Sequence, residues 1–185
     1  MVVEIPGAGQ VPEELEIVLG YARGKKLILE IGTAGGGSLY QFMQVADQCA
    51  TLVSIDMPDG MFGSGQPQPD IGVMLSWRRI GQTLYIIRDN SHAIATVNKV
   101  LNVLEKRKFD FAFIDGDHTY EGVKRDYDLY HGFCKLMAFH DIVNHPNIPE
   151  VGVDRFWKEL EGDKTEIIHD PDQGWAGIGI LKLEA

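Results

Sequence analysis

Carboxylate and imidazole side chains stand at the ends of two short apolar runs in the second half of the chain. Asp115 directly follows the run at residues 109–114, His118 comes three residues later, and His140 and Asp141 end a second run. Such side chains can hold a divalent cation, and an imidazole with an ordinary pKa of about 6.5 can accept a proton at neutral pH. We therefore take Asp115, His140 and Asp141 as candidate metal ligands. Asp115 and His118 are the candidate catalytic residues, with His118 as the general base.

The histidine at position 140 bears on the choice of metal. Mg²⁺ prefers oxygen ligands, so an imidazole beside Asp141 indicates a softer divalent metal, a supporting role next to the metal, or a site without metal. The sequence leaves these three readings open. Asn144 and His145 follow closely enough to offer a further ligand.

A glycine-rich turn at residues 30–38 follows the first apolar run and opens a helical stretch. An open α/β sheet places its ligand at such a turn. A P-loop is excluded, because the turn contains no lysine to reach a phosphate. A loose dinucleotide fingerprint, Gly32-x-Ala34-x-x-Gly37 with Asp56 as the ribose acceptor, is one reading of the turn.

Glu30, at the start of this turn, argues against a pyrophosphate ligand. A carboxylate at the strand end repels pyrophosphate, whereas it suits a ligand that carries a cationic amino-acid group and no phosphate. S-adenosylmethionine is a ligand of this kind.

The alternation of apolar and amphipathic stretches predicts the elements that position these side chains. Five short apolar runs are candidate strands, at residues 27–31, 51–55, 83–87, 109–114 and 136–139. Helical patterns occupy residues 12–21, 38–48, 92–107 and 119–133. The runs are too apolar for strands with one wet face, so we expect strands buried on both faces of a doubly wound, mainly parallel α/β sheet.

The end of the chain departs from this alternation. After a helix at residues 153–160, two candidate strands at 165–169 and 177–183 are separated only by a Pro/Asp/Gly-rich turn. Two neighbouring strands joined by a short turn must be antiparallel. The sequence therefore predicts a C-terminal antiparallel hairpin.

A Gly/Pro-rich insertion at about residues 57–79 is too long for an ordinary connection and continues into a helix that carries Trp77. Long irregular loops in compact domains are usually lids, binding loops or disordered segments. We expect a lid over a pocket, and a mobile insertion without a role is the alternative.

Composition sets the class of protein. The 185 residues carry 27 acidic and 17 basic side chains, a net charge of −10, and 44% of them are hydrophobic. We expect one globular domain over residues 1–185 that binds a small-molecule substrate and no nucleic acid, because non-specific phosphate binding needs clustered basic residues. Without a long apolar stretch we expect no membrane partner and a cytoplasmic protein. A homo-oligomer remains open.

The two cysteines, Cys49 and Cys134, each sit beside a predicted strand. We expect both to be reduced thiols in the core, although the sequence leaves a disulfide open.

Taken together, the motifs resemble the class I S-adenosylmethionine-dependent methyltransferases. That family opens with an acidic residue, a glycine-rich turn and a helix, and Ala34 stands where many members have a second glycine. The segments 113–120 and 138–142 look like the subgroup of cephalosporin hydroxylase-like proteins and macrolide sugar O-methyltransferases. The resemblance implies a seven-stranded Rossmann-like sheet that ends in an antiparallel hairpin strand.

The resemblance also implies roles for particular residues. Asp56 would accept hydrogen bonds from the ribose hydroxyls, and residues 89–91 would hold the adenine edge. The cofactor-binding residues it implies are Glu30, Gly32, Thr33, Ala34, Gly36, Ser38, Asp56, Asp89, Asn90, Ser91 and Asp115.

For function, the resemblance implies methyl transfer from S-adenosylmethionine to an oxygen of a small hydroxylated substrate. In the subgroup a Mg²⁺ ion orients two substrate oxygens, and macrolide-type relatives tend to have an acid where this chain has His140. Two alternatives stay open: an NAD-dependent oxidoreductase built on the looser glycine fingerprint, and a non-catalytic module that binds a nucleoside ligand.

Ordinary structural roles are expected for other polar and aromatic residues. Residues 89–91 also read as a helix N-cap. Phe156, Trp157 and Leu160 are expected in the core. A solvated acidic face is expected from Asp117, Glu121, Asp126 and Asp128.

Overall fold

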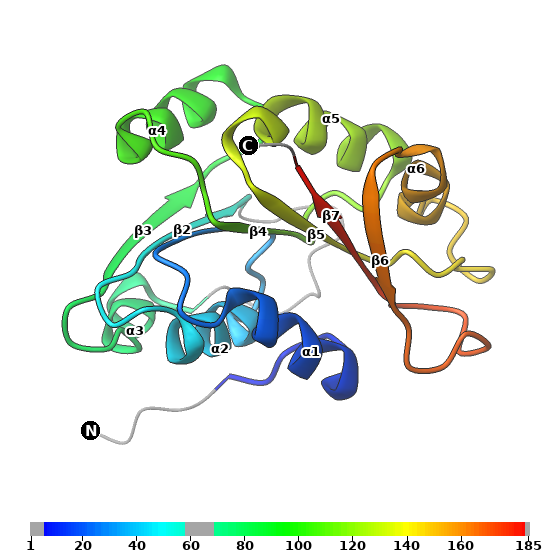
Figure 1. The fold of residues 1–185 in the computed structure, drawn as a ribbon, viewed down its shortest axis with the longest axis horizontal. Helices are drawn as coiled ribbons and strands as arrows, with labels where there is room; N and C mark the ends of the chain where they lie inside the picture. Colours follow the sequence, from blue (N-terminus) through cyan, green and yellow to red (C-terminus); the bar gives the residue numbers. More distant parts are fainter. Residues whose placement is uncertain (1–5, 58–68, 184–185) are drawn as a thin grey trace.

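The computed structural model describes residues 6–57 and 69–183, and within them the chain forms a seven-stranded sheet in the order β3-β2-β1-β4-β5-β7-β6 (Figure 1). The first five strands in sequence are parallel and the last two run antiparallel to their neighbours. The doubly wound α/β sheet with a C-terminal antiparallel hairpin is therefore confirmed. The strands are β1 (Leu27–Ile31), β2 (Thr51–Asp56), β3 (Thr83–Arg88), β4 (Phe111–Ile114), β5 (Leu136–His140), β6 (Asp163–Ile167) and β7 (Ile178–Lys182).

Helices cover both faces of the sheet (Figure 1). One layer contains α1 (Pro12–Ala22), α2 (Gly37–Val45) and the short α3 (Ile71–Ser76). The other layer contains α4 (Ile94–Leu104), α5 (Tyr120–Tyr130) and α6 (Val153–Glu159), and a 3₁₀ turn at His131–Phe133 follows α5. These bounds agree with the helices expected from the sequence to within a few residues, apart from α3, for which no bounds were predicted.

Each face of the sheet has its own hydrophobic core. On the side of α1 to α3, fully buried Phe42 packs against Phe111 and Phe113, with ring centroids 5.5 and 5.4 Å apart. On the opposite side Phe139 packs against Trp157, at 5.9 Å. Burying one such side chain contributes roughly 1.5–3 kcal/mol. The core roles expected for Phe156 and Trp157 are confirmed.

The central strands are buried on both faces, as expected, but β3 is not. All residues of β1 and β4 are buried, whereas Tyr85 of β3 is 45% exposed. The prediction for residues 83–87 was wrong because β3 is the edge strand next to β2, where one face lies open.

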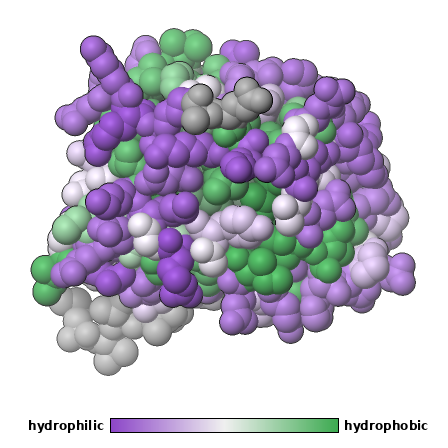
Figure 2. Space-filling model, in the orientation of Figure 1, coloured by the Kyte–Doolittle hydropathy of each residue, from purple (hydrophilic) through white to green (hydrophobic). Residues whose placement is uncertain are grey.

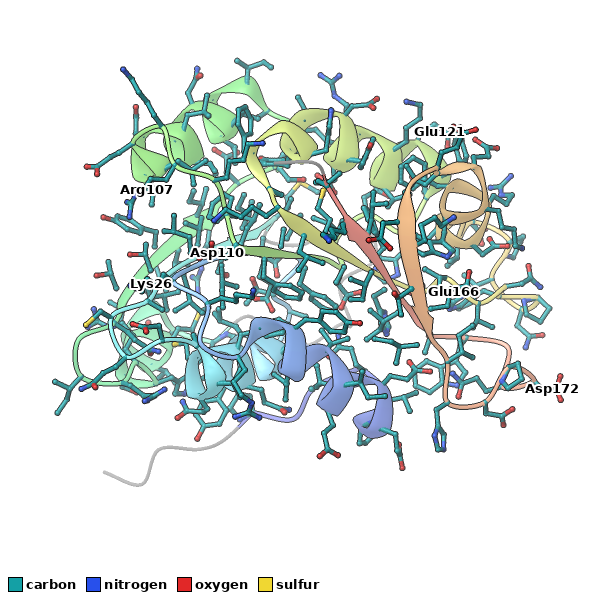
Figure 3. All side chains as sticks on the ribbon, in the orientation of Figure 1. Lys26, Arg107, Asp110, Glu121, Glu166 and Asp172 are labelled. Atoms are coloured by element: carbon teal, nitrogen blue, oxygen red, sulfur yellow. The ribbon has the colours of Figure 1, made fainter. Side chains whose placement is uncertain are left out.

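The hairpin also has an order that sequence did not predict. β7 lies between β5 and β6 and pairs antiparallel with both. The last strand in sequence is therefore an inner strand, and β6 is the edge strand of the sheet. Trp157 of α6 donates a hydrogen bond from Nε1 to Glu166 of β6 at 2.8 Å, which fixes this edge to the helix (Figure 3).

Two expectations for polar residues need correction. Asp126 is fully buried rather than part of a solvated face, and it lies 3.3 Å from His92 Nε2. Both cysteines are free thiols, but Cys49 is exposed and only Cys134 is in the core.

Asp110, the residue before β4, links that strand to the start of β1. Its carboxylate accepts hydrogen bonds from the backbone N–H groups of Lys26 and Leu27 (Figure 3).

The insertion at about residues 57–79 is only partly described. Residues 58–68, on which the lid prediction mainly rests, lie outside the described residues. Met74 and Trp77, from its second half, are buried and belong to the core beside α2.

Figure 2 shows hydrophobic residues gathered over the middle and lower right of the face in view, with hydrophilic residues around them. No helix in the described residues has the length and apolarity needed to cross a membrane.

Candidate active site

The candidate residues lie where the sheet topology predicts, along the carboxyl ends of its parallel strands. Glu30 is in β1, Asp56 ends β2, Asp89 follows β3, Asp115 follows β4, and His140 ends β5. Because β2, β1, β4 and β5 are neighbours in the sheet, their ends form one continuous row. Open α/β sheets bind ligands at this edge.

The glycine-rich turn packs tightly against its surroundings. Gly32 and Gly36 have φ angles of 89° and 83°, a region that favours glycine. A Cβ atom at Gly32 would lie 2.0 Å from the backbone oxygen of Asp115, and one at Gly36 would lie 2.6 Å from the Trp77 ring. The turn is thus wedged between the end of β4 and Trp77. Ala34, the departure from the family pattern, has a positive φ of 43°.

Asp56 holds the turn in place. Its Oδ2 accepts hydrogen bonds from the backbone N–H groups of Thr33 at 2.8 Å and Ala34 at 2.5 Å. The Thr33 hydroxyl lies 2.5 Å from that of Ser54 in β2. A small pocket opens here, lined by Thr33, Ala34, Ser54, Asp56, Met74, Ile86 and Arg88.

Glu30 is fully buried beneath the turn. Its Oε1 accepts a hydrogen bond from the Ser38 hydroxyl at 2.7 Å, and Oε2 has no hydrogen-bond partner among the described residues. Burial raises the pKa of Glu30 to about 8, against the lowering effect of the Ser38 hydrogen bond. Burial therefore favours the protonated form of Glu30 at neutral pH.

This burial predicts a pH-dependent stability. The pKa of Glu30 is 4.5 in the unfolded chain and about 8 in the folded protein. Between these pH values the native state binds a proton that the unfolded state has lost, so the free energy of unfolding falls as pH rises through this window. Glu30→Gln, which keeps an acceptor for Ser38, should therefore gain stability over the wild type as pH rises from 4.5 to 8. The gain should be a few kcal/mol, since each pKa unit corresponds to about 1.36 kcal/mol.

Urea unfolding at pH 5, 7 and 8.5 measures this difference. Glu16→Gln, which changes an exposed acid on α1, is the matched control and should follow the wild type. Parallel pH curves for wild type and Glu30→Gln would contradict the assignment of a protonated Glu30.

The turn after β3 is not a helix N-cap. α4 begins at Ile94, and its N-cap residue is Ala93, whose side chain cannot accept a hydrogen bond. Instead Asn90 Oδ1 accepts from the backbone N–H of His92 at 2.8 Å, and the backbone oxygen of Ser91 accepts from the Tyr130 hydroxyl at 2.8 Å. Contact of residues 89–91 with an adenine remains a prediction.

The two aspartates and the histidines converge at the ends of β4 and β5. His118 Nδ1 lies 2.5 Å from Asp141 Oδ2, and His118 Nε2 lies 3.6 Å from Asp115 Oδ1. His140 Nδ1 lies 3.0 Å from Asp115 Oδ1 and 3.3 Å from Asp141 Oδ1. We call these four residues together with His145, whose Nε2 lies 3.1 Å from Asp141 Oδ1, the Asp–His cluster.

The two oxygens of Asp141 have different partners. Oδ2 accepts from His118, whereas Oδ1 accepts from the backbone N–H of Ala176 at 3.2 Å and faces His140 and His145. A positive φ of 66° at Asp141 turns its side chain to this position directly after β5. Asp141 can therefore orient His118 with one oxygen and face a cation with the other.

Charges in the cluster are strongly coupled. Burial alone would lower the pKa of His118 and of His140. The negative charges of Asp115 and Asp141, and for His118 also its hydrogen bond to Asp141, outweigh burial, so both pKa values are raised. Burial would raise the pKa of Asp141, but its hydrogen bond with His118 and the neighbouring imidazoles of His140 and His145 hold it well below its usual range. Asp141 is thus an ionised carboxylate whose charge is shared among neighbouring imidazoles.

The cluster fits a metal ion. One ligand atom from each of Asp115, His140 and Asp141 lies within 4.8 Å of the other two, the same three residues that the sequence suggested. His140 is 6% exposed, and neither of its ring nitrogens makes a hydrogen bond with good geometry among the described residues. A buried imidazole of this kind, beside two carboxylates, is suited to coordinate a cation.

Gln10 was missed by sequence reasoning. Its Nε2 donates a hydrogen bond to Asp115 Oδ2 at 2.6 Å, from a segment that precedes α1. The same segment contacts the start of α2, because a Cβ on Gly37 would lie 2.1 Å from the backbone oxygen of Gly7. No local pattern could indicate a contact between residues 105 positions apart.

Glu14 was also missed by sequence reasoning. It lies in the first turn of α1 and is fully buried. Its Oε2 accepts from the backbone N–H of Gly177, and its Oε1 from that of His169, both at 3.0 Å. It thereby holds the loop whose Ala176 N–H contacts Asp141.

Comparisons with solved structures agree with the fold. An O-methyltransferase from Bacillus cereus, solved in complex with SAH, is 18% identical, with a TM-score of 0.65, and the match covers 97% of this chain and 84% of that one. The O-methyltransferase TomG from Streptomyces achromogenes, involved in tomaymycin synthesis and solved with SAM, is 19% identical, with a TM-score of 0.63, over 96% of this chain and 82% of that one. These similarities confirm the fold.

The family assignment rests on sequence. No curated protein matched the chain. The sequence model of a family described as a methyltransferase domain matches residues 29–142, from β1 to the residue after Asp141. This match spans more than half of the chain and includes the glycine-rich turn, Asp56 and four of the five residues of the Asp–His cluster, so the protein belongs to the methyltransferase domain family.

Proposed function

We propose that the protein transfers a methyl group from S-adenosylmethionine to a hydroxyl oxygen of a small substrate, with a divalent metal at the Asp–His cluster. The observation that supports the proposal best is the contact between the glycine-rich turn and the Asp–His cluster. The glycine turn packs directly on the backbone of Asp115, which contributes a carboxylate to the cluster. A cofactor on the turn would therefore lie beside a general base. The similar enzymes solved with SAM or SAH support this choice of cofactor.

The cofactor would use the residues around the turn. Asp56 uses Oδ2 for the backbone of the turn, so Oδ1 is the atom we assign to the ribose hydroxyls. Thr33, Ala34 and Gly36 would line the cofactor, and the pocket beside Asp56 would take part of the nucleoside. Glu30 lies beneath the turn, bonded to Ser38, and an ammonium group of the cofactor would favour its ionised form.

His118 would act as the base. Asp141 Oδ2 accepts a hydrogen bond from the Nδ1–H group of His118, which leaves Nε2 as the ring atom that takes a proton from the substrate hydroxyl. The hydroxyl oxygen then attacks the methyl carbon, the new C–O bond forms as the bond from carbon to sulfur breaks, and the sulfonium becomes a neutral thioether. A metal bound at Asp115, His140 and Asp141 would lower the pKa of the hydroxyl and orient it.

Binding and turnover measurements separate this proposal from the alternatives. Calorimetry with S-adenosylhomocysteine and with NAD identifies the cofactor, and we expect binding only of the former. Catalysis is tested by transfer of a labelled methyl group from S-adenosylmethionine to each of a panel of small catechols and sugars. The assay is run with and without divalent metal. Binding of NAD instead would support an oxidoreductase. Cofactor binding without transfer to any acceptor would support a nucleoside-binding module.

Asp56→Ala should weaken binding of S-adenosylhomocysteine about ten- to a hundredfold. A charge-assisted hydrogen bond contributes roughly 1.5–3 kcal/mol, and each 1.4 kcal/mol is about a factor of ten in affinity. Calorimetry gives the affinity, and a thermal melt shows whether the fold survives. Asp56→Asn is the control for the turn, because its amide oxygen can still accept from Thr33 and Ala34. An affinity equal to that of the wild type in Asp56→Ala would remove Asp56 from the site.

A further inference from the structure

We propose that the metal centre at Asp115, His140 and Asp141 selects a nitrogen-seeking transition ion of the zinc type over magnesium. The inference rests on the proposed function, because it concerns the metal of the same site. It starts from the donor set that the fold brings together, which contains an imidazole between two carboxylates.

His140 is held in a donor position. It is the last residue of β5, and backbone pairing with Ile178 of β7 fixes its place in the sheet. Nδ1 points between the two carboxylates, at 3.0 and 3.3 Å from their Oδ1 atoms, without hydrogen-bond geometry. Two ligands of one ion with bonds of about 2.1 Å are ~3.0 Å apart at right angles and ~3.4 Å apart at the tetrahedral angle of zinc sites. The spacing therefore suits three donors on one small cation.

Both carboxylates are already oriented to give one oxygen each. Gln10 occupies Oδ2 of Asp115, and His118 occupies Oδ2 of Asp141. The Oδ1 atoms are the ones that face His140. Hydrogen bonds to the other oxygen of a ligating carboxylate are a usual support of metal sites. Gln10 and His118 thus engage one oxygen of each aspartate, and the two Oδ1 atoms that face His140 Nδ1 are the oxygen ligands we assign to the ion, although Asp141 Oδ1 also accepts from the Ala176 N–H.

A second imidazole borders the same oxygen. His145 Nε2 lies 3.1 Å from Asp141 Oδ1, and its Nδ1 lies 2.8 Å from the backbone oxygen of Val143. His145 therefore places a second imidazole nitrogen beside one of the three proposed ligand atoms.

This donor chemistry opposes magnesium. Mg²⁺ requires near-ideal octahedral geometry with oxygen ligands, whereas imidazole suits zinc, iron and nickel. Affinities of a mixed nitrogen and oxygen site also rise along the first transition series up to copper. His140 is thus the specificity-determining ligand, because an acid in its place would make the set all oxygen.

Metal affinity of the metal-free wild type tests the proposal without any methyl donor. We expect Zn²⁺ and Co²⁺, measured by competition with a chromophoric chelator, to bind at least a hundredfold more tightly than Mg²⁺. Bound Co²⁺ should also show visible absorption bands that differ from those of the aqueous ion. Mg²⁺ binding as tightly as Zn²⁺, or the absence of binding of any of the three ions, overturns the proposal.

His140→Asp identifies the residue responsible. This variant should lose at least tenfold in Zn²⁺ affinity and change the Co²⁺ spectrum, while His131→Asp, an exposed histidine that precedes β5, should change neither. Unchanged Zn²⁺ affinity in a folded His140→Asp overturns the assignment, and the wild-type comparison stands if that variant does not fold. Calorimetry with S-adenosylhomocysteine in the presence of chelator tests the proposed function separately. Absence of cofactor binding would count against the proposed function and not against the choice of metal.

Discussion

Replacing His118 by alanine should lower methyl-transfer turnover about 10²- to 10⁴-fold, the usual contribution of a general base. The reason is geometric: His118 is the imidazole whose Nδ1 is fixed by Asp141 at 2.5 Å, while the rest of the ring reaches toward Asp115. Removing the ring leaves the glycine turn, Asp56 and Glu30 intact. We therefore expect the affinity for S-adenosylhomocysteine to stay near that of the wild type.

Initial rates at saturating cofactor measure the effect, and calorimetry measures cofactor affinity. His131→Ala serves as the matched control, because it removes an exposed histidine that precedes β5. A steady rise of the residual rate of His118→Ala with pH would indicate hydroxide replacing the base. Full turnover in His118→Ala, with wild-type cofactor affinity, would rule out His118 as the base and with it the assignment of this crevice.

The second large effect concerns Asp141. Asp141→Ala should abolish metal-stimulated activity, and chelation of the wild type should mimic this loss. Asp141 has two tasks, because Oδ1 faces His140 while Oδ2 fixes His118. We therefore expect Asp141→Ala to be slower than the chelated wild type, since the variant loses the orientation of His118 as well as the metal.

Rates with and without chelator, for both proteins, separate these two contributions. Asp163→Ala changes an exposed acid that lies 3.9 Å from Lys182 and should behave as the wild type. If chelation leaves the wild-type rate unchanged, the metal part of the proposal is wrong, and His118 or His140 would act as base in a metal-free site. If Asp141→Ala equals the chelated wild type, Asp141 serves the metal alone.

Much of the fold could be predicted because the central strands consist almost entirely of apolar residues, which indicates by itself that they are buried. The runs at 27–31 and 136–139 lack a polar alternation, which is the pattern of a strand covered on both faces, and both became central strands. The ends of such strands are also local features. Asp115, His140 and Asp141 could therefore be proposed as one group, because parallel strands bring their carboxyl ends to one edge of a sheet.

Other features depend on contacts that no local pattern encodes. β3 is half exposed because it is the edge strand, and β7 lies between β5 and β6, although the sequence of β3 is nearly as apolar as that of the central strands. Asp126 looks like its solvated neighbours on α5 but is buried against His92.

In the site, too, some features follow from the local sequence and others from contacts between distant residues. The sequence by itself determined which acids and imidazoles stand at strand ends, because strand ends follow from hydrophobic periodicity along a short stretch. Only the tertiary structure decided their partners: Gln10 on Asp115, and Asp141 shared between His118 and His145. A hydrogen bond depends on the positions of two atoms, and for residues 105 apart those positions are set by the packing of the whole sheet and its helices rather than by either residue's neighbours in sequence.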